Sequence, residues 1–480
     1  MRIGSEPKSQ THIVAAAAQP TATVAVLVLT DLFALMAAGV LAVILRGVFD
    51  QGFNHSLYYS LWPAMALFVV VYFIVGLYPG VGLAPAEELR RLTLATTLVY
   101  LVLAAGTFLF KEGNTYSRAV LLGAWMLSVV LVPLARALVR HVAAHRPWWG
   151  YPVVVLGAGK TGRMVVRALK RNPGLGFKPV AVLDDNPDKH GSLEGVPVVG
   201  GVELAPALAA ELRVRHAIVA MPGVPREKLL HILESYGGIF PHIVLIPDLF
   251  GFSSLWVSAA DLGGVLGLEL RQRLLLPGPR SLKRAIDLAS ALLGGLLISP
   301  LLLLIAIWIK LDSRGPIFYG HTRIGQEGRR FKAWKFRSMI PNADRVLQDY
   351  LERHPELQAE WEATQKLKND PRVTRVGRWL RKLSLDELPQ LWNVIRGEMS
   401  LVGPRPIVQE ELAKYGEKGV LYLKVKPGMT GLWQVSGRSE TSYQERVEID
   451  AYYVRNWSVW LDLYILARTV WVVLFGRGAY

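Results

Sequence analysis

Two adjacent carboxylates, Asp386 and Glu387, are the side chains in this 480-residue sequence that are best placed to carry out a reaction. A basic segment, residues 372–382, precedes them, and Arg405 follows between two prolines. Carboxylates among fixed cations suit chemistry on a phosphate or diphosphate, because cations offset the substrate's charge. A carboxylate there can act as nucleophile, base or metal ligand. Since neighbouring helical side chains point about 100° apart, the pair favours two different roles over one shared proton.

Two further cations, Lys335 and Arg337, alternate with apolar residues in the segment 331–339. A period of two places both side chains on one face of a strand. This pattern is typical of a solvated sheet edge and equally of a phosphate cradle. The segment alone favours neither interpretation.

The composition limits which kinds of partner and which kinds of metal site this chain can have. The chain is 52% apolar, which predicts membrane segments. A net charge of +16 suits nucleic acid, an anionic membrane face or phosphate-bearing substrates, and the long apolar runs favour the last two. We therefore expect no nucleic-acid partner. The absence of cysteine excludes disulfides and thiolate metal sites, so any metal should be a hard cation on oxygen ligands.

Residues 1–146 predict an N-terminal bundle of four transmembrane helices. The apolar runs are long enough to cross a bilayer, and they cover residues 22–45, 57–77, 92–110 and 119–139. Asp31 in the first run should face a neighbouring helix. No cleavage-site pattern of a removable signal peptide follows it. Arginines after the second and fourth runs place the N-terminus and everything after residue 140 in the cytoplasm, by the positive-inside rule.

Residues 147–273 predict a central α/β Rossmann-like domain. A β-rich run precedes Gly157, Gly159 and Gly162, and Asp184 ends the next predicted strand. This pattern fits the dinucleotide-binding fingerprint. It opens a rival function, a membrane-anchored NAD-dependent nucleotide-sugar dehydratase or epimerase. A Rossmann-like fold that keeps its tight turn but binds nothing is a second interpretation, and a non-catalytic sensor or dimerisation domain is a third, which we favour for this region.

The last module, residues 281–480, begins with another apolar run at residues 284–311. Ser299 and Pro300 interrupt it, and proline removes a backbone donor and bends a helix. Basic residues flank both ends, which fits a segment that enters and leaves the membrane on one face. We predict a re-entrant helix rather than a fifth span. A second apolar stretch, residues 456–475, contains three tryptophans and predicts a helix lying on the membrane surface.

From residue 281 onward the sequence resembles the bacterial sugar transferase family, the monotopic polyprenyl-phosphate phosphoglycosyl transferases. Its matching motifs follow in order over about two-fifths of the chain: KRAID at 283–287, Ser299-Pro300, KFRSM at 335–339, DPRVTRVGR at 370–378, LSLDELPQLWN at 383–393, SLVGPRP at 400–406 and KPGMTGLWQVSGR at 426–438. The four spans and the central domain resemble the long undecaprenyl-phosphate galactose or glucose phosphotransferase branch. The whole is thus expected to be a multi-domain membrane protein with a C-terminal α/β catalytic domain.

The resemblance implies transfer of a hexose 1-phosphate from a UDP-sugar, UDP-galactose or UDP-glucose, to undecaprenyl phosphate with release of UMP. This would be the first membrane step of O-antigen, capsule or exopolysaccharide synthesis. Asp386 corresponds to a nucleophile that forms a covalent phosphosugar intermediate, and Glu387 to its partner. Arg381, Arg405 and Arg438 correspond to phosphate-binding positions. Mg²⁺ is the implied cofactor, with Asp386 as candidate ligand, in a homodimer of the bacterial inner membrane.

Overall fold

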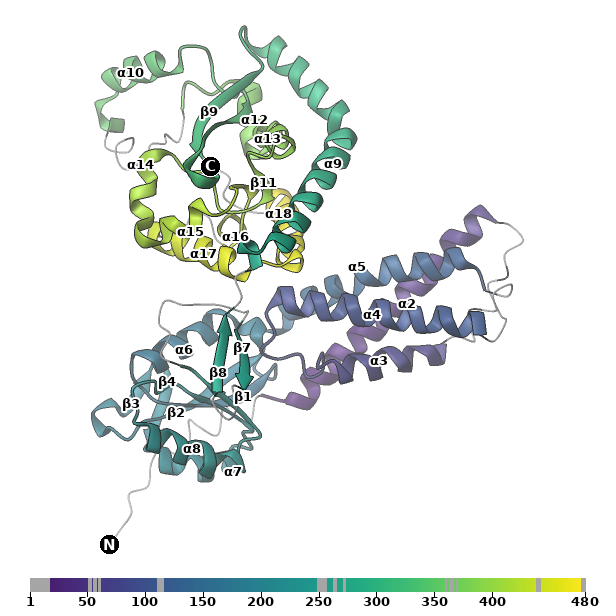
Figure 1. The fold of residues 1–480 in the computed structure, drawn as a ribbon, viewed down its shortest axis with the longest axis vertical. Helices are drawn as coiled ribbons and strands as arrows, with labels where there is room; N and C mark the ends of the chain where they lie inside the picture. Colours follow the sequence, from purple (N-terminus) through teal and green to yellow (C-terminus); the bar gives the residue numbers. More distant parts are fainter. Residues whose placement is uncertain are drawn as a thin grey trace. The chain divides into compact units, whose positions relative to one another are not determined.

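The structure is a computed structural model. It describes residues 18–50, 54, 58, 62–109, 116–247, 257–261, 266–270, 273–358, 361, 367, 370–436 and 442–475. The chain forms two compact units, Met1–Phe250 and Gly251–Tyr480 (Figure 1).

Four helices form the N-terminal bundle: α2 (Pro20–Phe49), α3 (Met65–Ile74), α4 (Pro85–Leu109) and α5 (Arg118–Ala143). By length and composition α2, α4 and α5 could each cross a membrane. At the second predicted span, the described apolar helix covers Trp62–Ile74. Residues 57 and 59–61 of that predicted run lie outside the described residues.

Small side chains bring α2 and α5 together. Ala34, Ala38 and Ala42 of α2 are buried at a spacing of four residues. A Cβ atom added to Gly123 of α5 would lie 3.6 Å from the Ala42 Cβ, an ordinary packing distance. Close approach through small residues is a common way for helices to associate in a membrane.

The prediction that Asp31 faces a neighbouring helix is confirmed. Its carboxylate accepts hydrogen bonds from Arg136 Nε (2.8 Å), Arg136 Nη2 (2.5 Å) and the Tyr78 hydroxyl (2.5 Å). Arg136 also pairs with Glu88 at 2.9 Å, and Glu88 accepts a hydrogen bond from Arg140 at 2.8 Å. Arg136 lies near the end of the fourth predicted run, and because its charge is neutralised inside the bundle it adds little to the orientation argument.

The central region has the predicted Rossmann-like α/β architecture. Its six-stranded sheet has the order β3-β4-β2-β1-β5-β6, and every pairing except β3 with β4 is parallel. The strands are β1 (Tyr151–Leu156), β2 (Phe177–Leu183), β3 (Gly191–Leu193), β4 (Val196–Gly200), β5 (His216–Val219) and β6 (His242–Leu245), with helices α6 (Lys160–Arg171), α7 (Ala205–Glu211) and α8 (Arg226–Gly237). Alternate β1 side chains enter two hydrophobic cores: Val153 and Val155 one, Val154 and Leu156 the other.

The second unit begins with a hairpin of β7 (Val257–Asp261) and β8 (Leu266–Leu270). The division at residue 250 lies before the predicted domain boundary at 273, because this hairpin groups with the second unit. The remaining strands form an antiparallel pair, β9 (Phe318–Ile324) with β10 (Arg330–Phe336), and a parallel pair, β11 (Ser400–Val402) with β12 (Gly428–Thr430). The helices around them are α10 (Ala343–Arg353), α12 (Arg375–Lys382), α13 (Gln390–Arg396), α14 (Gln409–Leu412), α15 (Gly419–Leu423), α16 (Leu432–Val435), α17 (Tyr443–Asn456) and α18 (Val459–Phe475).

Helix α9 (Pro277–Asp312) contains 36 residues, with Pro300 in its interior, and Figure 1 shows that it curves around one side of the unit. The helix bends but continues through the predicted interruption. Before Pro300, Ala291 packs with Phe331 and Val394. Near its end, Ile305 and Ile309 pack in a second core. Large apolar side chains between these anchors are exposed, among them Leu292, Leu293, Leu296, Leu297 and Leu304.

Helix α18 has two different ends. Near its start, Asp462 is buried and accepts hydrogen bonds from Lys283 (2.7 Å), the Tyr453 hydroxyl (2.8 Å) and Trp457 Nε1 (2.9 Å). Towards its other end, Val470, Trp471 and Leu474 are exposed. Asp462 therefore anchors this helix into the unit, and the exposed end keeps the apolar character of the predicted surface helix.

Candidate active site

Asp386 lies on a short 3-10 turn, Leu385–Glu387, between α12 and α13. Ser384 precedes the turn with a left-handed backbone, φ +54°. Asp386 is only 9% exposed. The turn thus buries one carboxylate of the pair, while Glu387 beside it stays half-buried.

Lys335 of β10 reaches both carboxylates unequally. Its Nζ lies 2.6 Å from Glu387 Oε1 and 3.9 Å from Asp386 Oδ2. Glu387 therefore holds the ammonium in a hydrogen-bonded ion pair. In the part of the chain that the structure describes, no other residue donates a hydrogen bond to the Asp386 carboxylate. The two acids have different surroundings, in line with the different roles inferred from their adjacency.

Burial raises the pKa of the Asp386 carboxyl, because desolvation disfavours its charged form, and the charge of Glu387 adds to this rise. Lys335 and Arg381 act in the opposite direction. A carboxylate that is poorly solvated and not hydrogen-bonded by neighbours is more basic and more nucleophilic than one in water. It therefore suits attack on an electrophile brought into the site.

Arg381, in the last turn of α12, is the basic-segment residue with an electrostatic effect on Asp386. Its Nε donates a hydrogen bond to the Ser338 hydroxyl at 2.9 Å. Desolvation lowers the pKa of Arg381, and Asp386 and Asp370 oppose that change. Arg372 has a different role, since it forms a buried two-point ion pair with Asp370 at 2.8 and 2.6 Å.

The contacts of Arg337 disfavour its predicted role beside Lys335. Its Nη2 donates to the Ser313 carbonyl (2.7 Å) and hydroxyl (2.8 Å), and its Nη1 donates to the Arg314 carbonyl (3.0 Å). The strand ends at Phe336, so the period-two argument does not extend to Arg337. The side chain instead holds the segment that follows α9.

Arg405 belongs to a cluster of arginines near Glu387. Its guanidinium lies 5.6 Å from the centre of the Trp433 ring, and that of Arg446 lies 5.0 Å from the same ring. Desolvation lowers the pKa of Arg405, the charges of Arg446 and Arg323 lower it further, and Glu387 and Glu411 oppose them. The acids offset much of the charge of the three guanidinium groups, whose planar N–H donors still suit the oxygens of an anionic substrate.

Sequence reasoning missed Arg323, Trp433 and Arg446. Trp433 lies within the motif at 426–438, and the other two are single arginines on β9 and α17 that no local pattern distinguishes. Arg446 also pairs with Glu411 at 3.5 Å and lies 4.0 Å from Asp450. Arg438, the last predicted phosphate-binding residue, lies outside the described residues.

The glycine-rich turn of the central domain has the expected backbone. Gly157 has φ +108°, and a Cβ atom on Gly162 would lie 1.8 Å from the Gly157 carbonyl oxygen, whereas Gly159 faces open space. Asp184 is less available: its carboxylate accepts from Ala158 N (2.7 Å) and Asn186 N (3.0 Å) and pairs with Lys189 (3.1 Å). Burial alone would raise the pKa of Asp184, but these partners lower it. A carboxylate already bonded to the glycine turn and to its own loop does not favour the dehydratase or epimerase reading.

Metal ligands are few around Asp386. Within the described residues, no group of three or more His, Cys, Asp or Glu side chains could hold a metal ion. Mg²⁺ commonly binds through one or two carboxylates together with substrate phosphates. Asp386 and Glu387 fit that limited donor set, whereas a metal held by protein side chains alone does not fit.

Comparison with known proteins separates the central region of the chain from the C-terminal module that contains Asp386. Residues 279–476 match the family model described as bacterial sugar transferase, and residues 74–247 match the one described as CoA-binding domain. A UDP-galactose-lipid carrier transferase of Erwinia amylovora is 40% identical over 76% of each chain. An undecaprenyl-phosphate galactose phosphotransferase of Salmonella typhimurium is 39% identical over 76% of this chain and 77% of the relative.

The chain belongs to the bacterial sugar transferase family. Within it, the chain is similar over about three quarters of its length to the long undecaprenyl-phosphate hexose phosphotransferases, since these matches extend well beyond the C-terminal module. A UDP-glucose:undecaprenyl-phosphate glucose-1-phosphate transferase of Escherichia coli is also 34% identical over 83% of this chain and 84% of the relative. The predicted family and branch are confirmed.

Proposed function

We propose that this protein transfers a hexose 1-phosphate from a UDP-sugar to undecaprenyl phosphate and releases UMP. The observation that carries the proposal is the Asp386 carboxylate, which is buried, lacks a hydrogen bond from any other described residue and lies 3.9 Å from the Lys335 ammonium. The names of the relatives support UDP-galactose or UDP-glucose as donor.

The reaction proceeds by two displacements at one phosphorus. An Asp386 oxygen attacks the sugar-bearing phosphorus of the donor, and the bond to the bridging oxygen breaks, so UMP departs with that electron pair. The sugar phosphate is then held as an acyl phosphate on Asp386. A phosphate oxygen of undecaprenyl phosphate attacks the same phosphorus and releases the carboxylate. The acceptor is already an anion, so a general base has no proton to remove, and covalent catalysis is the better use of the acid.

The surrounding cations stabilise the charge that develops on UMP and on the transferred phosphoryl group. Lys335 and Arg381 flank Asp386, while Arg405, Arg323 and Arg446 form a second group near Glu387. Arg438 remains a predicted member of this set. Mg²⁺, when bound by Asp386 or Glu387 together with the diphosphate, would offset further negative charge and make UMP a better leaving group.

Helix α9 supports a re-entrant arrangement in the membrane. The helix packs into the same α/β unit on both sides of Pro300, at Ala291 and at Ile309, while the leucines between them are exposed. A helix that crossed the bilayer would have its two ends on opposite sides. The bend at Pro300 instead lets the apolar middle enter the membrane and keeps the site at headgroup level, where the lipid phosphate lies.

We further propose that the catalytic unit faces the cytoplasm from the bacterial inner membrane and begins a surface polysaccharide. Arg90, Arg91 and Arg146 support this orientation through the positive-inside rule. The polymer stays open between O-antigen, capsule and exopolysaccharide. The homodimer remains a prediction from the resemblance.

The proposal is tested by UMP release from a panel of UDP-sugars by the purified, full-length protein, with and without undecaprenyl phosphate. We expect multiple turnovers with UDP-galactose or UDP-glucose only when the lipid phosphate is present. A donor panel without any lipid-dependent UMP release would contradict the proposed function. Release of UDP instead of UMP would show that a different bond is broken.

A further inference from the structure

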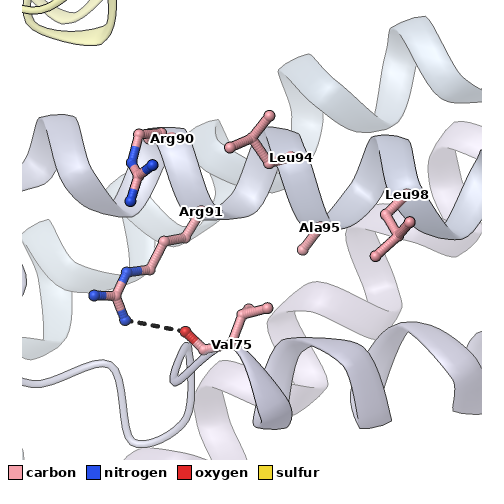
Figure 2. A pocket seen from close by; sticks show the side chains of 6 residues that line it. All are labelled: Val75, Arg90, Arg91, Leu94, Ala95 and Leu98. Carbon is pink, nitrogen blue, oxygen red and sulfur yellow. Dashed lines mark hydrogen bonds between the residues drawn. The ribbon is translucent and has the colours of Figure 1, made fainter.

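A pocket of about 300 Å³ opens on the N-terminal bundle where α3 ends and α4 begins (Figure 2). None of its residues takes part in the proposed transfer. They are Val75, Arg90, Arg91, Leu94, Ala95 and Leu98. Helix α4 starts with the acidic residues Glu87 and Glu88, and its apolar stretch begins at Leu92, directly after the two arginines. The pocket therefore spans the level at which a membrane changes from polar headgroups to hydrocarbon.

The polar end of the pocket keeps an excess of positive charge. Glu87 accepts hydrogen bonds from Arg90 Nε and Nη2, both at 2.8 Å, and from Arg91 Nε at 2.9 Å. Glu88 forms ion pairs with Arg136 and Arg140 inside the bundle and does not neutralise Arg90 or Arg91. Two guanidinium groups against one carboxylate leave a net charge of about +1.

Some guanidinium donors remain for a ligand. Arg91 Nη1 donates to the Val75 carbonyl at 3.0 Å and so caps the last turn of α3. Within the described residues, Arg90 Nη1 and Arg91 Nη2 make no hydrogen bond. Among the described residues, Arg90 makes no hydrogen bond to α3. It can therefore exchange Glu87 for a ligand while Arg91 continues to cap α3.

The rest of the pocket is apolar and runs along α4. Figure 2 shows Leu94, Ala95 and Leu98 following the arginines along the helix, with Val75 opposite. Leu94 and Leu98 are each 52% exposed, whereas Ala95 is buried and its small side chain leaves the space open. One end of the pocket thus offers cation donors and the other offers hydrocarbon contact.

We infer that this pocket binds an anionic membrane phospholipid, with its phosphate on Arg90 and Arg91 and an acyl chain against Leu94 and Leu98. Guanidinium groups match phosphate oxygens in geometry and charge. Basic pockets between transmembrane helices are known sites for anionic headgroups. A phosphodiester carries one negative charge and balances the one positive charge that Glu87 leaves. The bound lipid anchors the short α3 and the start of α4 to the membrane surface.

Lipid retention by the intact, full-length protein tests this inference. The protein is purified in a neutral detergent, titrated with phosphatidylglycerol or phosphatidylcholine, and its bound lipids are counted by native mass spectrometry. We expect one tightly retained phosphatidylglycerol and no comparable phosphatidylcholine. Inorganic phosphate in excess should not displace the lipid. Equal retention of the two lipids by the unmodified protein, or displacement of phosphatidylglycerol by inorganic phosphate, would overturn the inference.

Arg90→Gln should weaken phosphatidylglycerol binding about tenfold, since one charge-assisted contact is lost. Arg46→Gln is the matched control, because Arg46 pairs with Asp50 at the far end of α2 and has similar exposure, 35% against 39% for Arg90. It should bind like the unmodified protein. Equal losses in both variants would contradict a local site. Displacement of phosphatidylglycerol by equimolar polyprenyl phosphate would assign the pocket to the lipid substrate and overturn the choice of ligand.

Discussion

Asp31 and Asp386 are both buried carboxylates near arginines, yet their surroundings differ. Asp31, 1% exposed, accepts three hydrogen bonds from Arg136 and Tyr78. Asp386, 9% exposed, accepts none from any other described residue, and its nearest cation is 3.9 Å away. A buried charge whose bonding capacity is filled stabilises one conformation, whereas an unfilled one is available for a ligand. Burial beside a cation therefore does not identify a reactive acid; its hydrogen-bond partners do.

The largest expected effect is the loss of turnover in Asp386→Asn. The amide cannot attack phosphorus, so the rate of UMP release should fall on the order of 10⁴-fold or more. Because no other described residue hydrogen-bonds to the Asp386 carboxylate, the variant should keep its membrane insertion and thermal stability. The assay is UMP release by purified protein, with the midpoint of thermal unfolding as the control. Turnover within tenfold of the unmodified enzyme would end the nucleophile assignment.

Asp31→Asn should have the opposite profile. Removing the Asp31 charge leaves the buried Arg136 with Glu88 as its acid, which Arg140 shares, and breaking such a buried pair costs about 3–5 kcal/mol of unfolding free energy. The rate of transfer per folded molecule should stay unchanged. Equilibrium unfolding in mixed detergent micelles measures the loss. Asp50→Asn, at a surface ion pair, is the control and should cost at most about 1 kcal/mol. A stable Asp31→Asn protein with impaired turnover would reverse the comparison.

Lys335→Gln and Arg337→Gln separate a site cation from a structural one. Loss of the ammonium beside both carboxylates should lower kcat/KM roughly 10²-fold, as for removal of one electrostatic donor. Arg337 instead holds the Ser313 and Arg314 carbonyls, so its variant should lower the unfolding temperature and leave kcat/KM within a few-fold. Steady-state kinetics and thermal unfolding of both proteins give the answer. Equal kinetic losses would restore Arg337 to the phosphate cradle.

The smallest effect concerns pH. Asp386 must be ionised to attack, and burial together with the Glu387 charge raises its pKa. Activity should therefore rise with pH through that raised pKa and fall below it. Glu387→Gln removes the negative neighbour and frees Lys335, so both changes move the acid limb of the kcat/KM profile to lower pH. A limb that stays in place, or moves to higher pH, would mean that another group controls it.

Local patterns were enough to predict much of the architecture. The alternation of Val153 to Leu156 and the glycines that follow them predicted the parallel sheet and its tight turn, because such patterns depend on neighbours in sequence. Asp31 was also correctly expected to face another helix, since the cost of a charge in lipid leaves few alternatives. The second span stays a prediction, since part of its apolar run lies outside the described residues.

The site was predictable where a motif carried it and unpredictable where the fold assembled it. Asp386, Lys335 and Arg381 lie in recognisable segments and come together as expected. Arg323 and Arg446 reach the Arg405 cluster from β9 and α17, far apart in the sequence, and no local signal marks them. Tertiary packing alone brings such residues together.

Direct detection of the covalent intermediate tests the central claim. The full-length enzyme is mixed with UDP-sugar in the absence of undecaprenyl phosphate, quenched, digested and analysed by mass spectrometry. The account predicts one hexose phosphate on the peptide that contains Asp386, its disappearance when the lipid phosphate is added, and its absence in Asp386→Asn. Lipid-dependent turnover without any such adduct, or an adduct on another residue, would contradict the account.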